Sequence, residues 1–175
     1  MLKDFNLLIS TSRGNERNAC SEVWYLLGEL GDKDAKVDIT PVIGLIVAKT
    51  SLNPLEVINK LKVILKERPW EFRYILKVVP IEIVIPAKLD ELKKISLSLI
   101  ERIGKDEKFR ITVEKRHTSL SSMDVIKAIA DGIDRKVDLK NPDKIILVEI
   151  IGNLAGISVI KPTDVLSVEK EKRAL

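Results

Sequence analysis

The chain has 175 residues, 45% of them hydrophobic, which is enough for a packed core in one ordinary domain or two small ones. No apolar run approaches the ~18 residues that span a bilayer, and the N-terminus lacks the basic segment and long apolar stretch of a secretory signal. A single cysteine and a single histidine exclude an internal disulfide, a multi-thiolate zinc site and paired-histidine catalysis. We therefore expect a globular cytoplasmic protein.

The charge is high but nearly balanced. Thirty Lys and Arg side chains against 26 Asp and Glu give a net charge of +4, which does not by itself indicate a nucleic-acid binder, because the placement of the cations decides that. Aromatic residues make up only 4% of the chain, so a stacking platform for single-stranded bases is poorly supplied.

The first 80 residues alternate between strand and helix patterns. Short apolar runs predict strands at residues 5–12, 37–40, 42–48 and 73–79. A helix with an apolar face runs from Ala19 to Leu30 after a turn in which Asn15 or Ser12 is expected as its N-cap, and a second helix begins at Pro54 with Asn53 as its N-cap. The resulting βαββαβ order predicts a ferredoxin-like domain over residues 1–80.

The rest of the chain predicts a second module over residues 81–162. Two prolines keep residues 79–86 extended, so we interpret that segment as a connection that cannot be a central strand. Helix, strand, helix, strand and strand patterns follow at residues 88–104, 108–115, from 121, 145–151 and 154–160, with Gly152-Asn153 as a tight hairpin turn. Residues 163–175 are expected to form a short charged tail. The fold class is therefore α/β (α+β).

No enzymatic motif stands out. Nucleophile-elbow, Walker A and GxGxxG patterns are absent. Residues 13–19 contain one glycine, too few for the pyrophosphate loop of an acetyltransferase, and are interpreted as a turn. Cys20 is expected on the buried face of its helix as a small hydrophobe. Asp131, Asp134 and Asp138 are expected to be solvated charges.

The densest basic segment surrounds His117, at the end of a predicted strand and just before a capped helix start. It contains Lys108, Arg110, Lys115, Arg116 and His117. One interpretation is a solvated loop in which His117 bonds a neighbour. The other is a phosphate site, in which these side chains act together with the unpaired amides of the helix N-terminus.

Residues 108–161 resemble the core of a THUMP domain. The resemblance rests on residues 109–117, Ser121-Ser122, residues 146–153 and, most specifically, the Val-Asp-Leu-x-Asn-Pro-Asp block from Val137. Residues 11–16 and 158–162 further resemble the stand-alone Tan-type (THUMPD-type) proteins that assist tRNA acetylation.

The resemblance implies a ferredoxin-like domain followed by a THUMP domain that binds the acceptor stem and 3′ end of tRNA. Because nothing follows Leu175, we expect a non-catalytic adaptor that delivers tRNA to a separate tRNA cytidine acetyltransferase, with no cofactor and no metal. The RNA-binding residues it implies are Arg110, Lys115, Arg116, His117, Ser121, Ser122, Lys140, Asn141, Lys144 and Lys161. Two alternatives stay open: a small-molecule sensor of the ferredoxin-like class, and an RNA-modifying enzyme in its own right.

Overall fold

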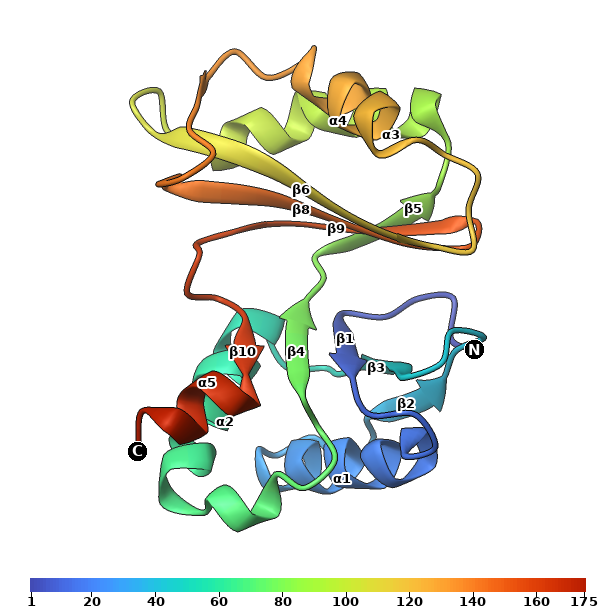
Figure 1. Ribbon diagram of the computed structural model, residues 1–175, viewed down its shortest axis with the longest axis vertical. Helices are drawn as coiled ribbons and strands as arrows, with labels where there is room; N and C mark the ends of the chain where they lie inside the picture. The colour runs from blue at the N-terminus through green and yellow to red at the C-terminus, as the bar shows by residue number, and fades with distance from the viewer. The chain divides into compact units, whose positions relative to one another are not determined.

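A computed structural model describes residues 1–175, and the chain divides into two units (Figure 1). The first unit comprises Met1–Ile81 together with Asp164–Leu175, and the second comprises Glu82–Thr163. Each unit contains one five-stranded sheet. The mixed α/β class predicted from the sequence is confirmed.

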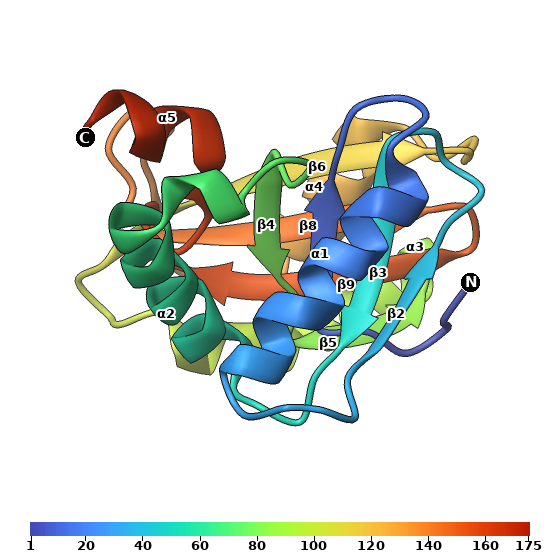
Figure 2. The same ribbon diagram turned by 90° about the horizontal axis from the view of Figure 1, so that it is seen from below.

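The first unit is an antiparallel sheet covered on one face by two helices (Figure 2). Its strands follow the order β10-β4-β1-β3-β2, and β1-α1-β2-β3-α2-β4 is the order along the chain. The bounds are β1 Leu7–Ser10, α1 Glu16–Glu29, β2 Lys36–Ile39, β3 Leu45–Lys49, α2 Pro54–Glu67, the short 3-10 helix η1 Pro69–Glu71, and β4 Lys77–Pro80. Alternate strand residues such as Leu7 and Ile9 pack against Leu26, Ile58 and Leu65 of the helices.

The two helices of this unit begin differently. At α2 the predicted N-cap is confirmed, because Asn53 Oδ1 accepts from Leu55 N at 2.9 Å and Glu56 N at 3.2 Å. At α1 the predicted side-chain cap is wrong. Asn15 occupies the cap position without capping, since its Nδ2 donates to Ser12 Oγ at 2.7 Å.

A carboxylate holds the turn before α1. Glu16 Oε1 accepts from Gly14 N at 3.3 Å and from Gly44 N at 3.2 Å. The pKa of Glu16 is lowered first by a bond from its own backbone N–H and then by the bonds from Gly14 and Gly44. The carboxylate of Glu16 therefore links the turn before α1 to the turn at Gly44.

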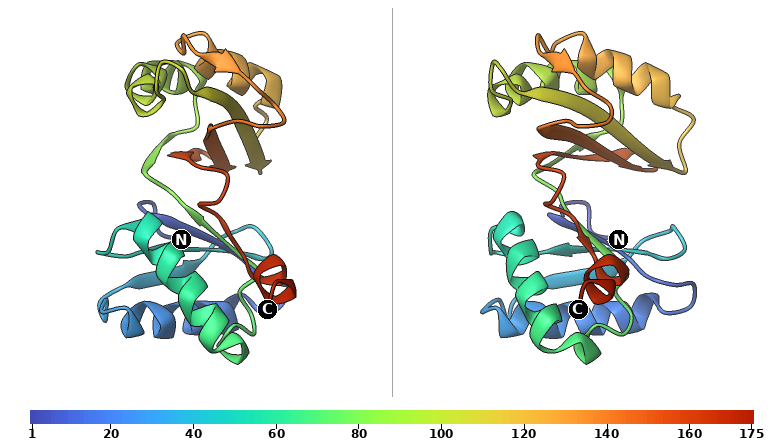
Figure 3. Two further views of the ribbon diagram at one scale, coloured as in Figure 1. Left: turned by 90° about the vertical axis from the view of Figure 1, so that its left-hand side faces the viewer. Right: turned by 60° about the vertical axis from the view of Figure 1, so that its left-hand side comes forward.

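The last residues, expected as a separate charged tail, are part of the first unit. They form β10 (Leu166–Ser167) and α5 (Val168–Arg173). Leu166 is buried opposite Val78 of β4, Lys172 Nζ donates to Phe72 O at 2.9 Å, and α5 lies beside α2 (Figure 3). The stretch is short and half of residues 164–175 are charged, so its few apolar side chains carry too little periodicity to predict this docking.

The second unit is a mixed sheet in the order β5-β9-β8-β6-β7, with α3 and α4 on one face (Figure 1). Its bounds are β5 Ile83–Pro86, α3 Leu89–Leu99, the 3-10 helix η2 Ile100–Arg102, β6 Lys108–Arg116, α4 Ser122–Ala130, β7 Lys136–Val137, β8 Lys144–Ile151, and β9 Leu154–Ile160. Strand β6 runs parallel to β8 and β7, whereas β9 is antiparallel to β8 and β5. The apolar strand β8 is central, as its composition predicts.

Two short strands extend the predicted order of the second unit. Strand β7 is only two residues long. Strand β5 lies within the segment expected as a plain connection, and it pairs with β9 at the edge of the sheet. Pro86 cannot donate to a ladder, and an edge position tolerates this because only one side of the strand is paired.

Candidate functional site

The site residues implied by the sequence all belong to the second unit, but they divide between the two opposite ends of its strands, and each end is here called an edge. We call the edge where α3 and α4 begin the helix-start edge; it holds Lys115, Arg116, His117, Ser121 and Ser122. The other, the loop edge, holds Arg110, Lys140, Asn141, Lys144 and Lys161. Strand β6 has nine residues and, at 3.3 Å per residue, separates the two edges by ~26 Å. One phosphate group cannot reach both.

Both helices of the second unit begin at the helix-start edge. Strand β5 leads into α3 and β6 leads into α4, and both strands end at this edge because both run parallel to β8. The first turn of each helix exposes N–H groups that carry partial positive charge. At α4, Ser121 Oγ accepts from Asp124 N at 3.4 Å. At α3 no side chain makes a capping hydrogen bond. These N–H groups can donate to an anion, and the first turns also carry carboxylates, Asp90 and Glu91 on α3 and Asp124 on α4.

Arg116 is engaged within the sheet. Its Nη1 donates to Glu149 Oε2 of the neighbouring strand β8 at 2.5 Å, and the Glu149 side chain is only 2% exposed. The main chain of Arg116 is also fixed, because its carbonyl oxygen accepts from Gly152 N at 2.8 Å. A phosphate would have to compete with a buried carboxylate for this guanidinium. Arg116 therefore positions the end of β6.

Lys115 and His117, the neighbours of Arg116 in the chain, are both exposed. Lys115 Nζ donates to Leu120 O at 3.0 Å, which closes the loop between β6 and α4. An ammonium has three donors, so this bond leaves capacity for a ligand. His117 has a φ of 56°, a left-handed conformation that is rare for a residue with a side chain. The loop therefore turns sharply and presents both side chains at this edge.

The loop edge owes its shape to two carboxylates of the Val-Asp-Leu-x-Asn-Pro-Asp block. Asp138 Oδ1 accepts from Lys140 N at 3.1 Å and Asn141 N at 3.0 Å. The bond from Asn141 is the main reason that the pKa of Asp138 lies below its usual value. Asp143 Oδ2 accepts from Lys108 N at 2.8 Å, which ties the loop to the start of β6. The block therefore builds the loop, and the side chains of Lys140 and Asn141 project from it, exposed.

Two cations of the predicted set also hold the loop edge together. Lys144 Nζ lies 2.9 Å from Glu107 Oε1 and donates to Arg102 O at 3.2 Å. The pKa of Glu107 is lowered, first by the Gly104 N–H and then by Lys144. Arg110 Nη1 donates to Leu139 O at 3.0 Å. On this edge Lys140 and Lys161 are the exposed cations of the set.

Lys88 is a candidate that the sequence reasoning missed. It is exposed and occupies the N-cap position of α3, so it lies on the helix-start edge. A cation at a helix N-terminus opposes the helix dipole. An unfavourable cation at this position could have indicated a functional role from the sequence alone. The sequence does not show at which edge α3 begins, because that depends on the pairing of β5 with β9.

Neither a membrane-crossing helix nor a metal-binding cluster is found. None of the helices combines the length and the apolar character needed to span a bilayer. Nowhere do three or more His, Cys, Asp or Glu side chains gather as metal ligands would.

The fold has close counterparts among solved structures. The structure of TrmN from Thermus thermophilus superimposes with a TM-score of 0.60 over 87% of this chain and 44% of that one, at 18% sequence identity. At this identity the comparison shows a shared fold.

Curated relatives match about half of this chain. They are the uncharacterized protein C25H2.10c of Schizosaccharomyces pombe, 33% identical over 97 residues (51% of this chain, 34% of the relative), and the tRNA acetyltransferase TAN1 of Saccharomyces cerevisiae, 30% identical over 103 residues (50% and 36%). This chain thus spans about a third of the length of either relative. The family model of the THUMP domain matches residues 86–160, which contain both edges described above up to Ile160. Residues 86–160 of this chain therefore match the THUMP domain family.

Proposed function

We propose that this protein binds tRNA through its THUMP domain and presents it, as a non-catalytic adaptor, to a separate acetyltransferase that modifies a cytidine. The THUMP domain and the similarity to a protein named tRNA acetyltransferase TAN1 support a role in tRNA modification. The observation that carries the proposal is the helix-start edge, where Lys88, Lys115 and the N-termini of α3 and α4 all lie at the same end of the strands.

Phosphate groups are the ligands that this edge suits best. Helix-terminal N–H groups and lysine amines contact phosphate oxygens without reading sequence, and their binding weakens as salt rises because counterions are released. Recognition of a duplex part would depend on its shape and 2′-hydroxyl groups. The exposed Lys140 and Lys161 lie ~26 Å away along the strands, so they would meet other phosphates of the same RNA.

An adaptor acts by raising the concentration of tRNA at its partner enzyme. We expect no acetylcytidine when the purified chain, tRNA and acetyl-CoA are combined, and acetylation once the partner enzyme is added. Acetyl transfer by the chain alone would contradict the adaptor role.

The interface is tested by removing its two lysine amines. The variant Lys88→Ala/Lys115→Ala should weaken tRNA binding at low salt by ~10-fold or more and reduce the slope of log affinity against log salt by about one per lost contact. Lys60→Ala/Lys66→Ala on α2 is the matched control, since it removes the same charge from exposed positions of the first unit. Equal affinities for the two variants would show that the helix-start edge does not contact the RNA.

A further inference from the structure

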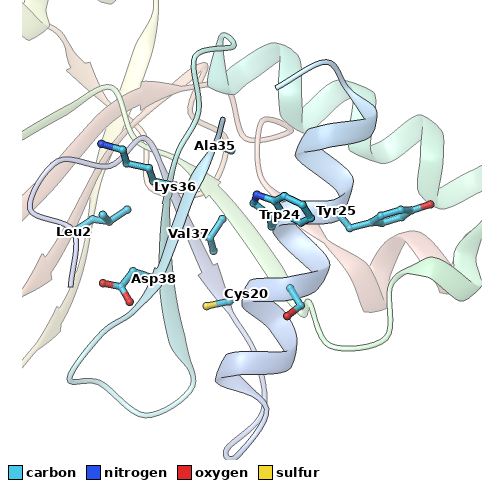
Figure 4. Close-up of a pocket in the computed structure, with 9 residues that line it drawn as sticks. Leu2, Cys20, Trp24, Tyr25, Ala35, Lys36, Val37 and Asp38 are labelled. Atoms are coloured by element: carbon cyan, nitrogen blue, oxygen red, sulfur yellow. The ribbon is translucent and has the colours of Figure 1, made fainter. Parts of the chain in front are cut away.

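The first unit leaves one edge of its sheet beside an open groove. Strand β2 is the last strand of the order β10-β4-β1-β3-β2, so alternate N–H and C=O groups along it have no neighbouring strand. Figure 4 shows the groove between α1 and β2; its volume is about 710 Å³. Its apolar walls are Leu2, Cys20, Trp24, Tyr25, Ala35 and Val37.

The residues along this edge alternate in character. Ala35, Val37 and Ile39 point to one face of the sheet, and Lys36 and Asp38 point to the other. Neither side chain faces an opposite charge on the adjacent strand β3, although Asp38 accepts from Ile39 N at 2.8 Å. Lys36 is exposed and lies opposite another cation, Lys49 of β3. Asp38 binds the Met1 amine at 3.1 Å, yet its side chain remains 42% exposed.

We propose that two copies of this chain associate by pairing their β2 strands antiparallel, centred on Val37. In that register Lys36 of each copy faces Asp38 of the other, so two pairs of opposite charges form. On the opposite face Val37 meets Val37, and Ala35 meets Ile39. Opposite charges and apolar pairs directly across an antiparallel ladder both stabilise it.

The same pattern rejects the neighbouring registers. A shift of two residues in one direction places Lys36 opposite Lys36, and a shift in the other direction places Asp38 opposite Asp38; like charges directly opposite destabilise a pair. A shift of one residue puts charged and apolar side chains across from each other. This charge complementarity with itself is the reason that we assign the groove to a second copy of the chain.

The strand β2 has only four residues, so a stable dimer would also need apolar contacts, and the groove beside β2 would supply them. Antiparallel edge pairing about a two-fold axis places both α1 helices on the same face of the joined sheet. Trp24, 55% exposed on α1 beside the groove (Figure 4), would then flank the junction from both copies. Aromatic side chains of this kind are enriched in protein interfaces. All these residues lie in the first unit, so the inference does not rest on tRNA binding.

Sedimentation equilibrium of the full chain over a dilution series tests the proposal. The wild type should dimerise, and Lys36→Asp or Asp38→Lys alone should weaken the dimer by ~10-fold or more, because each change turns both attractive pairs into repulsive ones. A wild type that is monomeric throughout would overturn the proposal and leave the edge to an extended segment of another protein.

Charge exchange supplies the control for folding. An equal mixture of Lys36→Asp chains and Asp38→Lys chains should form a mixed dimer, and the double variant Lys36→Asp/Asp38→Lys should dimerise like the wild type. Either rescue would show that the single variants are folded. A dimer that survives both single changes, or two single variants that fail to associate when mixed, would place the interface elsewhere and overturn the proposal.

Discussion

Neighbouring residues at the end of β6 have different roles because a strand sends successive side chains to opposite faces of its sheet. Lys115 reaches Leu120 O in the loop before α4, whereas Arg116 turns to Glu149 of β8. A basic cluster that looks uniform in sequence is therefore divided between an internal bond to the loop before α4 and an ion pair with the neighbouring strand. The partner of Arg116 lies on another strand, so neither residue type nor local spacing could predict this division.

The pairing of Arg116 predicts a change in stability. Arg116→Ala removes the cation beside a nearly fully buried carboxylate, so we expect a loss of about 2 kcal/mol in the free energy of unfolding, discounted from the value for a fully buried pair because Arg116 is partly exposed. Urea denaturation measures it. Lys115→Ala is the matched control and should stay within about 0.5 kcal/mol of the wild type. A similar loss in both variants would contradict the distinction between them.

Asp32 predicts a dependence on pH. Its carboxylate accepts from Thr50 Oγ1 at 2.6 Å, Ser51 N at 2.8 Å and Asp34 N at 3.2 Å, and the bond from Thr50 is the main cause of its lowered pKa. A lowered pKa in the folded state contributes stability that is complete above the unfolded value of about 3.9 and is lost as pH falls through the folded value.

The matching measurement compares the wild type with Asp32→Asn in denaturation series at several pH values. The wild type should be the more stable protein near neutral pH, and its advantage should shrink in acid once the carboxyl group is protonated. An advantage that is the same at every pH would show that the charge of Asp32 contributes nothing to stability.

At the scale of elements, only α2 of the two long helices of the first unit has a side-chain cap, and this yields a paired prediction. Asn53→Ala removes a side chain that caps α2 and should cost about 1 kcal/mol of stability. Asn15→Ala removes a side chain in the corresponding position of α1 that caps nothing, so its effect should be within about 0.5 kcal/mol. Equal losses in chemical denaturation would contradict the assignment of the caps.

Long periodic elements could be predicted from the sequence, whereas edge strands could not. The apolar stripes of α1, α2 and α4 and the continuous apolar run of β8 carry their own evidence. Strands β5 and β10 are short, and each exists because it pairs with a strand far away in the chain. The same pairing of β5 places Lys88 on the helix-start edge, which explains why this residue could not be predicted.

At the scale of the whole molecule, the chain returns to its first unit after completing the second. Leu166 is fully buried in the core of the first unit, whereas Leu175 is 60% exposed. Leu166→Ala should therefore cost ~2–4 kcal/mol, and Leu175→Ala should have little effect. Hydrogen exchange resolved by residue is the suitable readout: lost protection should be confined to residues 1–81 and 164–175. Loss confined to the second unit would contradict this docking.

At this scale the basic residues of the candidate site lie on two edges of the second unit, ~26 Å apart. An extended polyanion can contact both, which a small ligand cannot. A small-molecule sensor, the alternative function, would have a use for only one of the two edges.

The central claim, that the THUMP domain binds the acceptor end of tRNA, is tested most directly by titrating the chain with intact tRNA and with tRNA that lacks its 3′-terminal nucleotides, across a salt series. The account predicts affinity that falls steadily as salt rises and that drops further when the 3′ end is removed. Binding that ignores salt and 3′ trimming, or no binding at low salt, would contradict it.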